Sequence, residues 1–186
     1  ELNDELAQSA GYDNFAAMKE KVTADLRAKA EEKKHLELRW KALDAAVELS
    51  KVDYPPILEE REIDGLLTDE AQRFGYREVI DYLKRTSKTE EELREELRPI
   101  AKKRVTNSLV LEKVAEEEKI EISPAEVDNR VGEIAGSVED KEKMAQLLAQ
   151  PQVRESIEQS LRTQKTLDLL VRIVTESEDK AETKEE

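Results

Sequence analysis

Residues 89–114 read TEEELREELRPIAKKRVTNSLVLEKV, and this stretch carries the two main signals of a long α-helix. Thr89 followed by Glu92 is a capping box, in which the threonine oxygen accepts from an amide three residues on while the glutamate reaches back. Pro99 lies inside the pattern and predicts either a kink or a later start of the helix. The apolar residues recur every three or four positions, as on one helix face: Leu93, Leu97, Ile100, Ala101, Val105, Leu109, Leu111 and Val114.

The same period continues on both sides of this stretch, so we predict helices along the whole chain. Prolines at first turns, short polar caps and glycines mark where they begin and end. In chain order we expect a helix over 1–10 ended by Gly11, a long helix over 13–50 capped by Asp13 or Asn14, helices from Pro55-Pro56 to Gly75 and over 76–85, a helix opened by Ser123, Pro124 and Glu126, a short helix with Met144, Leu147 and Leu148, and a final helix after Pro151.

The composition agrees with an all-α fold. Five glycines and five prolines in 186 residues leave few turns for the hairpins of a β-sandwich or β-barrel. Charged residues make up 41% of the chain, as in long helices with narrow apolar stripes. We expect one helical domain over residues 1–175. Residues 176–186 have no large apolar side chain, so we expect them to form a disordered acidic tail.

Several function classes lack the residues that they need. The chain has no cysteine, so thiolate metal sites and cysteine nucleophiles are absent, and a net charge of −14 makes nucleic acid a poor partner. Glu32 and His35 match the E-x-x-H spacing of di-iron bundles, but such a site needs a second histidine and the chain has one. No glycine-rich phosphate loop can be built. We therefore expect neither enzyme chemistry, nor a metal, nor a cofactor.

Targeting and membrane signals are missing as well. No apolar run approaches the roughly 18 residues of a membrane-spanning helix, so we expect no membrane partner. The opening residues ELNDEL lack the basic start of a signal peptide and suggest the interior of a longer protein.

The remaining possibility is binding through apolar surface. The segment from Val131 to Leu148 is weakened by two glycines and carries Ile134, Val138, Met144 and Leu147. Weakly folded apolar surface that contains methionine can repack around varied partners. Phe74 at a helix end, with Leu66 two turns earlier on the same face, is a second candidate site. The alternative is that all six are ordinary core residues.

Two long runs resemble the C-terminal domain of bacterial trigger factor. The first is VDYPPILEEREIDGLL at 52–67, continuing through AQRFG at 71–75; the second extends from Glu91 to Val131 through AKKRV, LVL and EKIEIS. The opening ELNDELA resembles the stretch just after the prolyl isomerase domain of that family. The resemblance extends from residue 1 to about residue 175, and it lies in helical patterns rather than in catalytic motifs.

The resemblance implies an ATP-independent, ribosome-associated chaperone of the bacterial cytosol that holds unfolded or nascent polypeptides. It implies an elongated helical body with two protruding arms that form a cradle, here roughly residues 55–87 and 123–150, joined to a long linker helix at 13–50. The ribosome-binding and isomerase domains have no counterpart in this chain, so it should neither bind ribosomes nor isomerise prolyl bonds. The family's client-contacting positions correspond to Leu66, Phe74, Ile134, Val138, Met144 and Leu147.

Two other functions stay open at this point. The helical stripes would also suit a structural adaptor that binds one fixed partner or a second copy of the chain. Periplasmic chaperones linked to parvulin domains share a related helical framework. Weak self-association is compatible with each of these functions.

Overall fold

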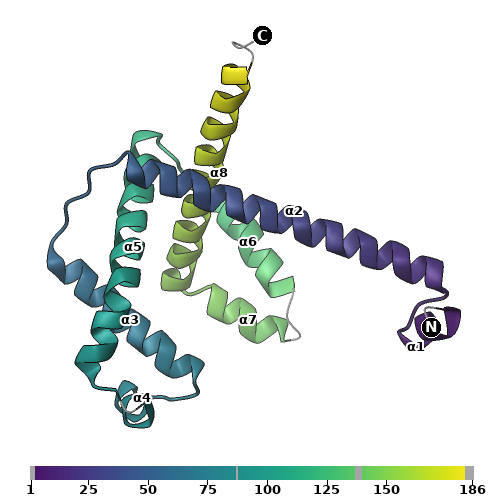
Figure 1. The fold of residues 1–186 in the computed structure, drawn as a ribbon, viewed down its shortest axis with the longest axis horizontal. Coiled ribbons are helices and arrows are strands. Elements are labelled where there is room, and N and C mark those ends of the chain that lie inside the picture. Colours follow the sequence, from purple (N-terminus) through teal and green to yellow (C-terminus); the bar gives the residue numbers. More distant parts are fainter. Residues whose placement is uncertain (1–2, 87, 137–139, 183–186) are drawn as a thin grey trace. The chain divides into compact units, whose positions relative to one another are not determined.

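The computed structural model describes residues 3–86, 88–136 and 140–182, with only the backbone given for 141–143 and 177–182. Within these ranges it contains α-helices and no strand, which confirms the all-α fold class (Figure 1). The chain divides into two compact units, Glu1–Lys41 and Ala42–Glu186. The helices are α1 (Asp4–Ser9), α2 (Phe15–Glu48), α3 (Pro56–Arg73), α4 (Val79–Thr86), α5 (Glu90–Glu117), α6 (Pro124–Gly136), α7 (Lys141–Leu148) and α8 (Pro151–Glu182).

The first unit consists of α1 and most of α2. The Asn14 side chain accepts from the Ala17 N–H at 2.9 Å, so Asn14 is the cap among the two residues predicted for it. Asp4 accepts from the Phe15 N–H at 2.8 Å and so fixes α1 against the start of α2. Residues 29–34 are all exposed, as expected from the charges that interrupt the apolar stripe.

Two more helix starts follow the predicted capping boxes. The Thr89 hydroxyl accepts from the Glu92 N–H at 3.2 Å, and the Thr89 N–H donates to the Glu92 carboxylate at 2.8 Å. Ser123 and Glu126 repeat this exchange at 3.4 and 3.0 Å. Because α5 begins directly after Thr89, Pro99 lies inside the helix rather than at its start.

Three helices end in the same backbone motif, in which an N–H donates to the carbonyl of a buried alanine five residues earlier. The residue before each donor takes the left-handed conformation, which glycine adopts without strain. Gly11 and Gly75 fill this position after α1 and α3, with φ of 84° and 81°, whereas Lys119 fills it after α5 with φ of 52°. The donors and acceptors are Tyr12 to Ala7, Tyr76 to Ala71 and Ile120 to Ala115, at 2.9, 2.9 and 2.8 Å.

Lys119 therefore carries backbone strain that glycine would remove. A side chain in the left-handed region costs about 1–2 kcal/mol, and part of the gain is offset by the freedom of glycine in the unfolded chain. We expect Lys119→Gly to raise the free energy of unfolding by about 0.5–1 kcal/mol in urea titrations followed by circular dichroism. The matched control is Lys102→Gly in the interior of α5, which should lower it by about 1 kcal/mol. A loss of stability in both variants would contradict the strain at Lys119.

The second unit has two separate clusters of buried side chains. The first core joins α3, α4 and the first half of α5, and α3 and α5 lie side by side along it (Figure 1). Its buried members are Ile63, Leu66, Leu67, Ala71, Tyr82, Leu93 and Ala101. The second core joins the end of α2, the second half of α5 and α8, with Ala42, Leu43, Val110, Leu111 and Leu170 as its buried members.

Helices α6 and α7 pack against each other and against α8. Their buried contribution is small, with Val127 and Leu148 as the buried apolar side chains of the part that the structure describes. Helix α8 continues to Glu182, past residue 176, where we expected a disordered tail to begin. The Arg172–Glu176 pair at 3.9 Å joins successive turns there, and such pairs support a charged helix.

Candidate functional site

Phe74 lies at the end of α3, in the turn that stops the helix. Because Gly75 adopts the left-handed conformation, the chain reverses directly after Phe74 and leads into α4. The helices of the first core do not cover the phenylalanine side chain, and 62% of Phe74 is exposed. An aromatic ring so exposed at a fixed helix end is available to a partner.

The ring of Phe74 rests on a second aromatic side chain. Tyr82 of α4 stacks against it with ring centroids 5.6 Å apart and planes 11° apart. The Tyr82 hydroxyl donates to the Glu70 carboxylate at 2.9 Å, and Tyr82 itself belongs to the first core. Burial of the phenol, and secondarily its hydrogen bond to Glu70, raise the pKa of Tyr82 above its usual value.

Leu66 does not share this exposure, although the same helical stripe suggested both residues. It is 7% exposed and is packed in the first core with Ile63 and Leu67. Its side chain cannot reach a client while α3 stays packed on α5, so we leave it out of the candidate surface. Phe74 differs because it lies after the last turn of α3 and is not among the buried residues of the first core.

The second predicted group lies on α6 and α7. Ile134 and Met144 are half-buried, and Leu147 is 48% exposed. Leu148, next to Leu147, is buried and holds the end of α7. Val138 lies outside the described residues. Thus three of the four residues predicted here present apolar atoms at the surface of one helical pair.

Ion pairs attach α6 to α8. Lys165 lies 2.6 Å from the Glu126 carboxylate, and Arg154 pairs with Asp128, two residues further along α6. Lys165, followed by the amide and hydroxyl of Ser123, lowers the pKa of Glu126 to about 2. Glu126 therefore both completes the capping box of α6 and links this helix to α8.

This lowered pKa predicts an acid-sensitive attachment of α6. A carboxylate whose folded pKa is depressed contributes stability in full above its usual pKa of 4.5, and that contribution is lost as the pH falls toward 2. We expect the protection factors of the α6 amides, which are hydrogen-exchange rates corrected for the intrinsic effect of pH on exchange, to fall over this interval in the wild-type protein. In Glu126→Gln the protection factors should already be lower at pH 6 and should change less with acid. Glu133→Gln on the same helix is the control, and the same response in both variants would contradict the assignment.

A network of ion pairs also fastens α3 to α5. Arg94 donates to Glu60 and to Asp64, each at 2.7 Å, and Arg98 donates to Glu60 at 2.7 Å and to Glu59 at 3.1 Å. Arg94 and then Arg98 lower the pKa of Glu60. The network fixes the helix that carries Phe74 at its end.

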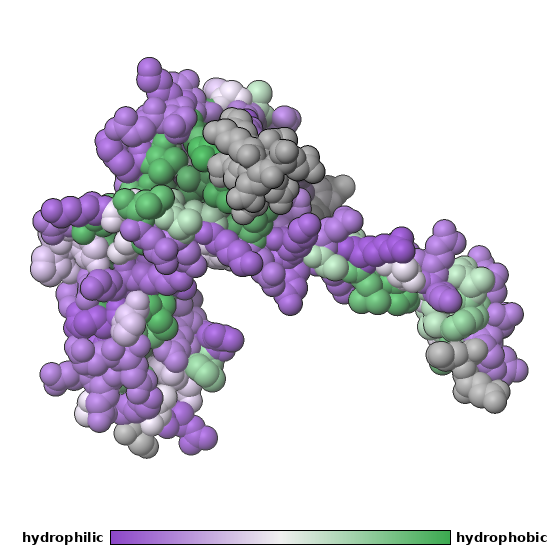
Figure 2. Space-filling model, turned by 45° about the horizontal axis from the view of Figure 1, so that its top comes forward, coloured by the Kyte–Doolittle hydropathy of each residue, from purple (hydrophilic) through white to green (hydrophobic). Residues whose placement is uncertain are grey.

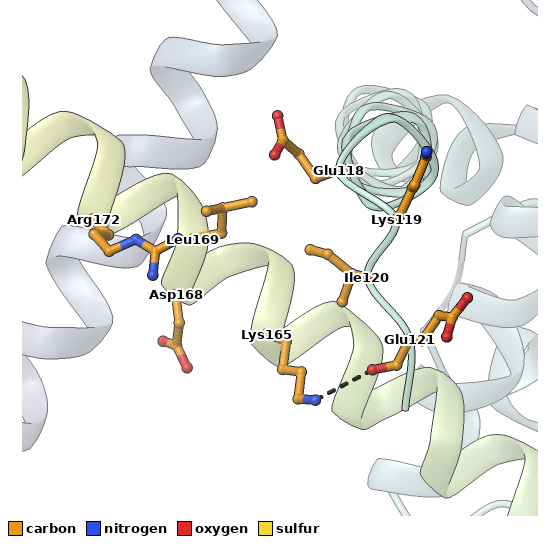
Figure 3. Close-up of a pocket in the computed structure, with 8 residues that line it drawn as sticks. All are labelled: Glu118, Lys119, Ile120, Glu121, Lys165, Asp168, Leu169 and Arg172. Carbon is orange, nitrogen blue, oxygen red and sulfur yellow. Dashed lines mark hydrogen bonds between the residues drawn. The ribbon is translucent and has the colours of Figure 1, made fainter. Parts of the chain in front are cut away.

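A cleft of about 580 Å³ lies between the end of α5 and α8 (Figure 3). Ile120 and Leu169 lie on its two sides, and Lys165 donates to the Glu121 carbonyl at 3.2 Å across it. Ligand pockets for small molecules are mostly apolar, whereas six of the eight residues that line this cleft are charged: Glu118, Lys119, Glu121, Lys165, Asp168 and Arg172. Sequence reasoning did not identify this cleft, and it is not part of the candidate surface.

Other exposed apolar side chains were missed because they belong to regular helical stripes, which predict burial. On the helices of the first core these are Ile57, Ile80 and Ile100. Figure 2 shows hydrophobic surface in separate areas that hydrophilic side chains border. Apolar residues are thus dispersed over the protein rather than gathered in one pocket.

The described residues contain no arrangement typical of a metal site. Among them, no group of three or more acidic or histidine side chains could hold a metal ion, and His35 lies exposed on α2. No described helix is long and apolar enough to cross a membrane.

Comparison with known proteins gives consistent matches to a single family. The family model described as "Bacterial trigger factor protein (TF) C-terminus" matches residues 14–172. A trigger factor from Clostridium beijerinckii is 33% identical over 91% of this chain, and one from Thermoanaerobacter sp. is 34% identical over 91%. The chain spans 41% and 40% of the length of these two relatives.

Solved structures agree in fold. A trigger factor chaperone structure, described for promiscuous substrate recognition in folding and assembly, matches with a TM-score of 0.56 at 22% identity, over 92% of this chain and 42% of that one. A structure of trigger factor domains from Thermotoga maritima also has a TM-score of 0.56, at 20% identity, over 74% of this chain and 81% of that one.

Proposed function

Because this chain belongs to the family of the bacterial trigger factor C-terminus, we propose that it is an ATP-independent chaperone domain that binds unfolded polypeptides through dispersed apolar side chains. The observation that carries the proposal is the exposure of apolar side chains at fixed helix positions in two separate groups. Phe74 belongs to the first core's helices and Leu147 to the α6–α7 pair.

Dispersed sites suit an unfolded client better than one pocket does. Each exposed side chain contributes a weak contact, but a flexible chain that occupies two or more sites gains roughly 10²–10⁴ in avidity. The high charge of the remaining surface keeps such apolar groups soluble between binding events. Binding then depends on the number of contacts and not on one defined client sequence.

The partners and location follow from the family as part of the proposal. We propose unfolded or nascent polypeptides as clients in the bacterial cytosol, with ribosome contact supplied by a domain other than this one. The matched family model is that of the C-terminus, and prolyl isomerisation is assigned to another domain of the family. The net charge of −14 supports the exclusion of nucleic acid.

The test is suppression of the aggregation of urea-denatured citrate synthase on dilution, measured by light scattering without ATP. The wild-type chain should suppress scattering, and the variant with four serine substitutions should need at least about tenfold more protein for the same effect. Because Ile134 and Met144 are half-buried, a double variant limited to the exposed residues Phe74 and Leu147 is measured as well. The four substitutions are Phe74→Ser, Ile134→Ser, Met144→Ser and Leu147→Ser.

A matched control replaces exposed leucines outside the two groups. Leu26→Ser with Leu49→Ser removes a similar exposed apolar area and should leave suppression unchanged. If the wild-type chain forms a stoichiometric complex with one folded partner and does not affect scattering, the adaptor function is supported instead. Equal losses in the control and the four-residue variant would refute the assignment of these two groups as the client surface.

A further inference from the structure

The group around Phe74 contains stacked aromatic rings, which the α6–α7 group lacks. These rings bear on which client side chains bind there. Tyr82 contacts two other aromatic rings. Its ring centroid lies 5.6 Å from that of Phe74 and 5.9 Å from that of Tyr76. Tyr82 is 6% exposed, whereas Phe74 is mostly exposed. One face of the Phe74 ring is therefore covered by Tyr82, and its opposite face is turned away from this support.

From this arrangement we propose that Tyr82 is a positioning residue that holds Phe74 as a flat site for uncharged ring side chains of the client. The inference rests on the proposed chaperone function and specifies what one of its sites recognises.

Two contacts fix Tyr82, and the helix stop after α3 fixes the backbone of Phe74. Its ring is packed in the first core, and its hydroxyl is tied to Glu70 one turn before the end of α3. The stop motif at Gly75 holds the backbone of Phe74 through the bonds from Gly75 to Gln72 and from Tyr76 to Ala71, each 2.9 Å. Since ring and backbone are both held, the exposed phenylalanine loses little conformational freedom when a client binds, which favours binding.

A fixed flat ring selects for shape as well as for apolar area. Stacked or edge-to-face aromatic pairs contribute beyond the burial of their area, by an amount that corresponds to about 2- to 10-fold in affinity. An aliphatic side chain of the same size buries a similar area but lacks the additional contribution of an aromatic pair. The α6–α7 group, with Ile134, Met144 and Leu147, has no aromatic ring among its predicted residues and should lack the preference.

The local charge points to an uncharged ring rather than to a guanidinium group, which also stacks on aromatic faces. Residues 69–85 carry four acidic and four basic side chains, so this part of a chain with net charge −14 is neutral. The Glu70 carboxylate nearest the stack already accepts from Tyr82. A cationic side chain at Phe74 would therefore meet a segment with no net negative charge.

The test uses a flexible twelve-residue Gly-Ser peptide with one guest position, titrated into the isotopically labelled chain and followed by NMR shifts near Phe74. The guests are phenylalanine, cyclohexylalanine, which has the same size but no flat ring, and arginine. We expect phenylalanine to bind about 2- to 10-fold more tightly than cyclohexylalanine, and arginine to bind more weakly than phenylalanine.

Variants of Tyr82 separate positioning from stability, because the readout is a ratio of two affinities on the same protein. Tyr82→Leu keeps an apolar side chain and should bring the ratio to about one, while Tyr82→Phe keeps the stack and should retain most of it. The control Leu49→Ser, at an exposed leucine outside both groups, should leave the ratio unchanged. If Tyr82→Leu does not fold, Tyr82→Met provides the test, because a methionine side chain fills irregular core space without a flat ring and should also bring the ratio to about one.

The outcomes distinguish this inference from the proposed function. Equal binding of phenylalanine and cyclohexylalanine to the wild-type chain, or a ratio unchanged in Tyr82→Leu, overturns the positioning role while client binding stands. Tighter binding of arginine overturns the choice of an uncharged ring. If no guest shifts the resonances near Phe74, the proposed function fails at this site and the inference fails with it.

Discussion

Replacing Ile63 by alanine is expected to lower the free energy of unfolding by about 2–5 kcal/mol, the largest effect of a single substitution that we predict. Ile63 is fully buried at the centre of the first core, where α3 meets α5. Alanine would leave a cavity, because close-packed neighbours such as Leu67 and Ala101 relax only in part. Urea titration measures the loss in the free energy of unfolding. Amide hydrogen exchange should become faster in α3 and α4.

The same helix provides a control of the same residue type. Ile57 lies one and a half turns earlier in α3 and is 55% exposed, so Ile57→Ala should change the free energy of unfolding by less than about 0.5 kcal/mol. Similar losses for the two isoleucines would show that α3 is not packed as described. Faster exchange at Leu43 and Leu170 in Ile63→Ala would show that the two cores do not unfold separately.

The second large effect is expected for Arg94→Ala, at about 1–2 kcal/mol. The Arg94 side chain is 23% exposed and bridges Glu60 and Asp64 of α3, so its loss removes the cation beside Asp64 and leaves Glu60 with Arg98 alone. We choose the lower part of the range for charged hydrogen bonds because solvent screens the exposed partners. Urea titrations at two salt concentrations measure both the loss in the free energy of unfolding and how far salt reduces that loss.

Salt and acid should both reduce this effect. Raising the ionic strength from about 0.1 M to 1 M shortens the screening length from about 10 Å to 3 Å, so the difference between wild type and Arg94→Ala should shrink. The depressed pKa of Glu60 means that its contribution is present above the usual value of 4.5 and is lost as the pH falls below it. Lys113→Ala, which removes only pairs with Glu116 and Glu117 on the same helix, should cost no more than about 0.5 kcal/mol.

The sequence predicted the helices well because their ends are encoded locally. The capping boxes at Thr89 and Ser123, the cap at Asn14 and the stop at Gly75 each depend on side chains within a few residues. The stop at Lys119 could not be predicted, since no glycine marks it. There the bond from Ile120 to Ala115 imposes a conformation that lysine does not favour.

The candidate site was predictable only in part, because helical periodicity finds apolar faces but not what covers them. Leu66 and Phe74 follow the same helical spacing, yet Leu66 is buried in the first core and Phe74, just after α3, is mostly exposed. The role of Tyr82 was equally hidden, since it depends on contacts with Phe74 and Glu70 across the turn between two helices. Such contacts between helices leave no trace in the spacing of residues along one helix.

The helix stops also have a consequence for how the chain folds during synthesis. Each closes within a short segment, AQSAGY at 7–12, AQRFGY at 71–76 and AEEEKI at 115–120, and local contacts of this kind form within about microseconds. Leu43 of the second core, in contrast, must wait for Leu170, which a ribosome adds roughly 6–25 s later at ordinary elongation rates. The boundaries of these helices can therefore be set in the emerging chain long before the core that holds the helices together is complete.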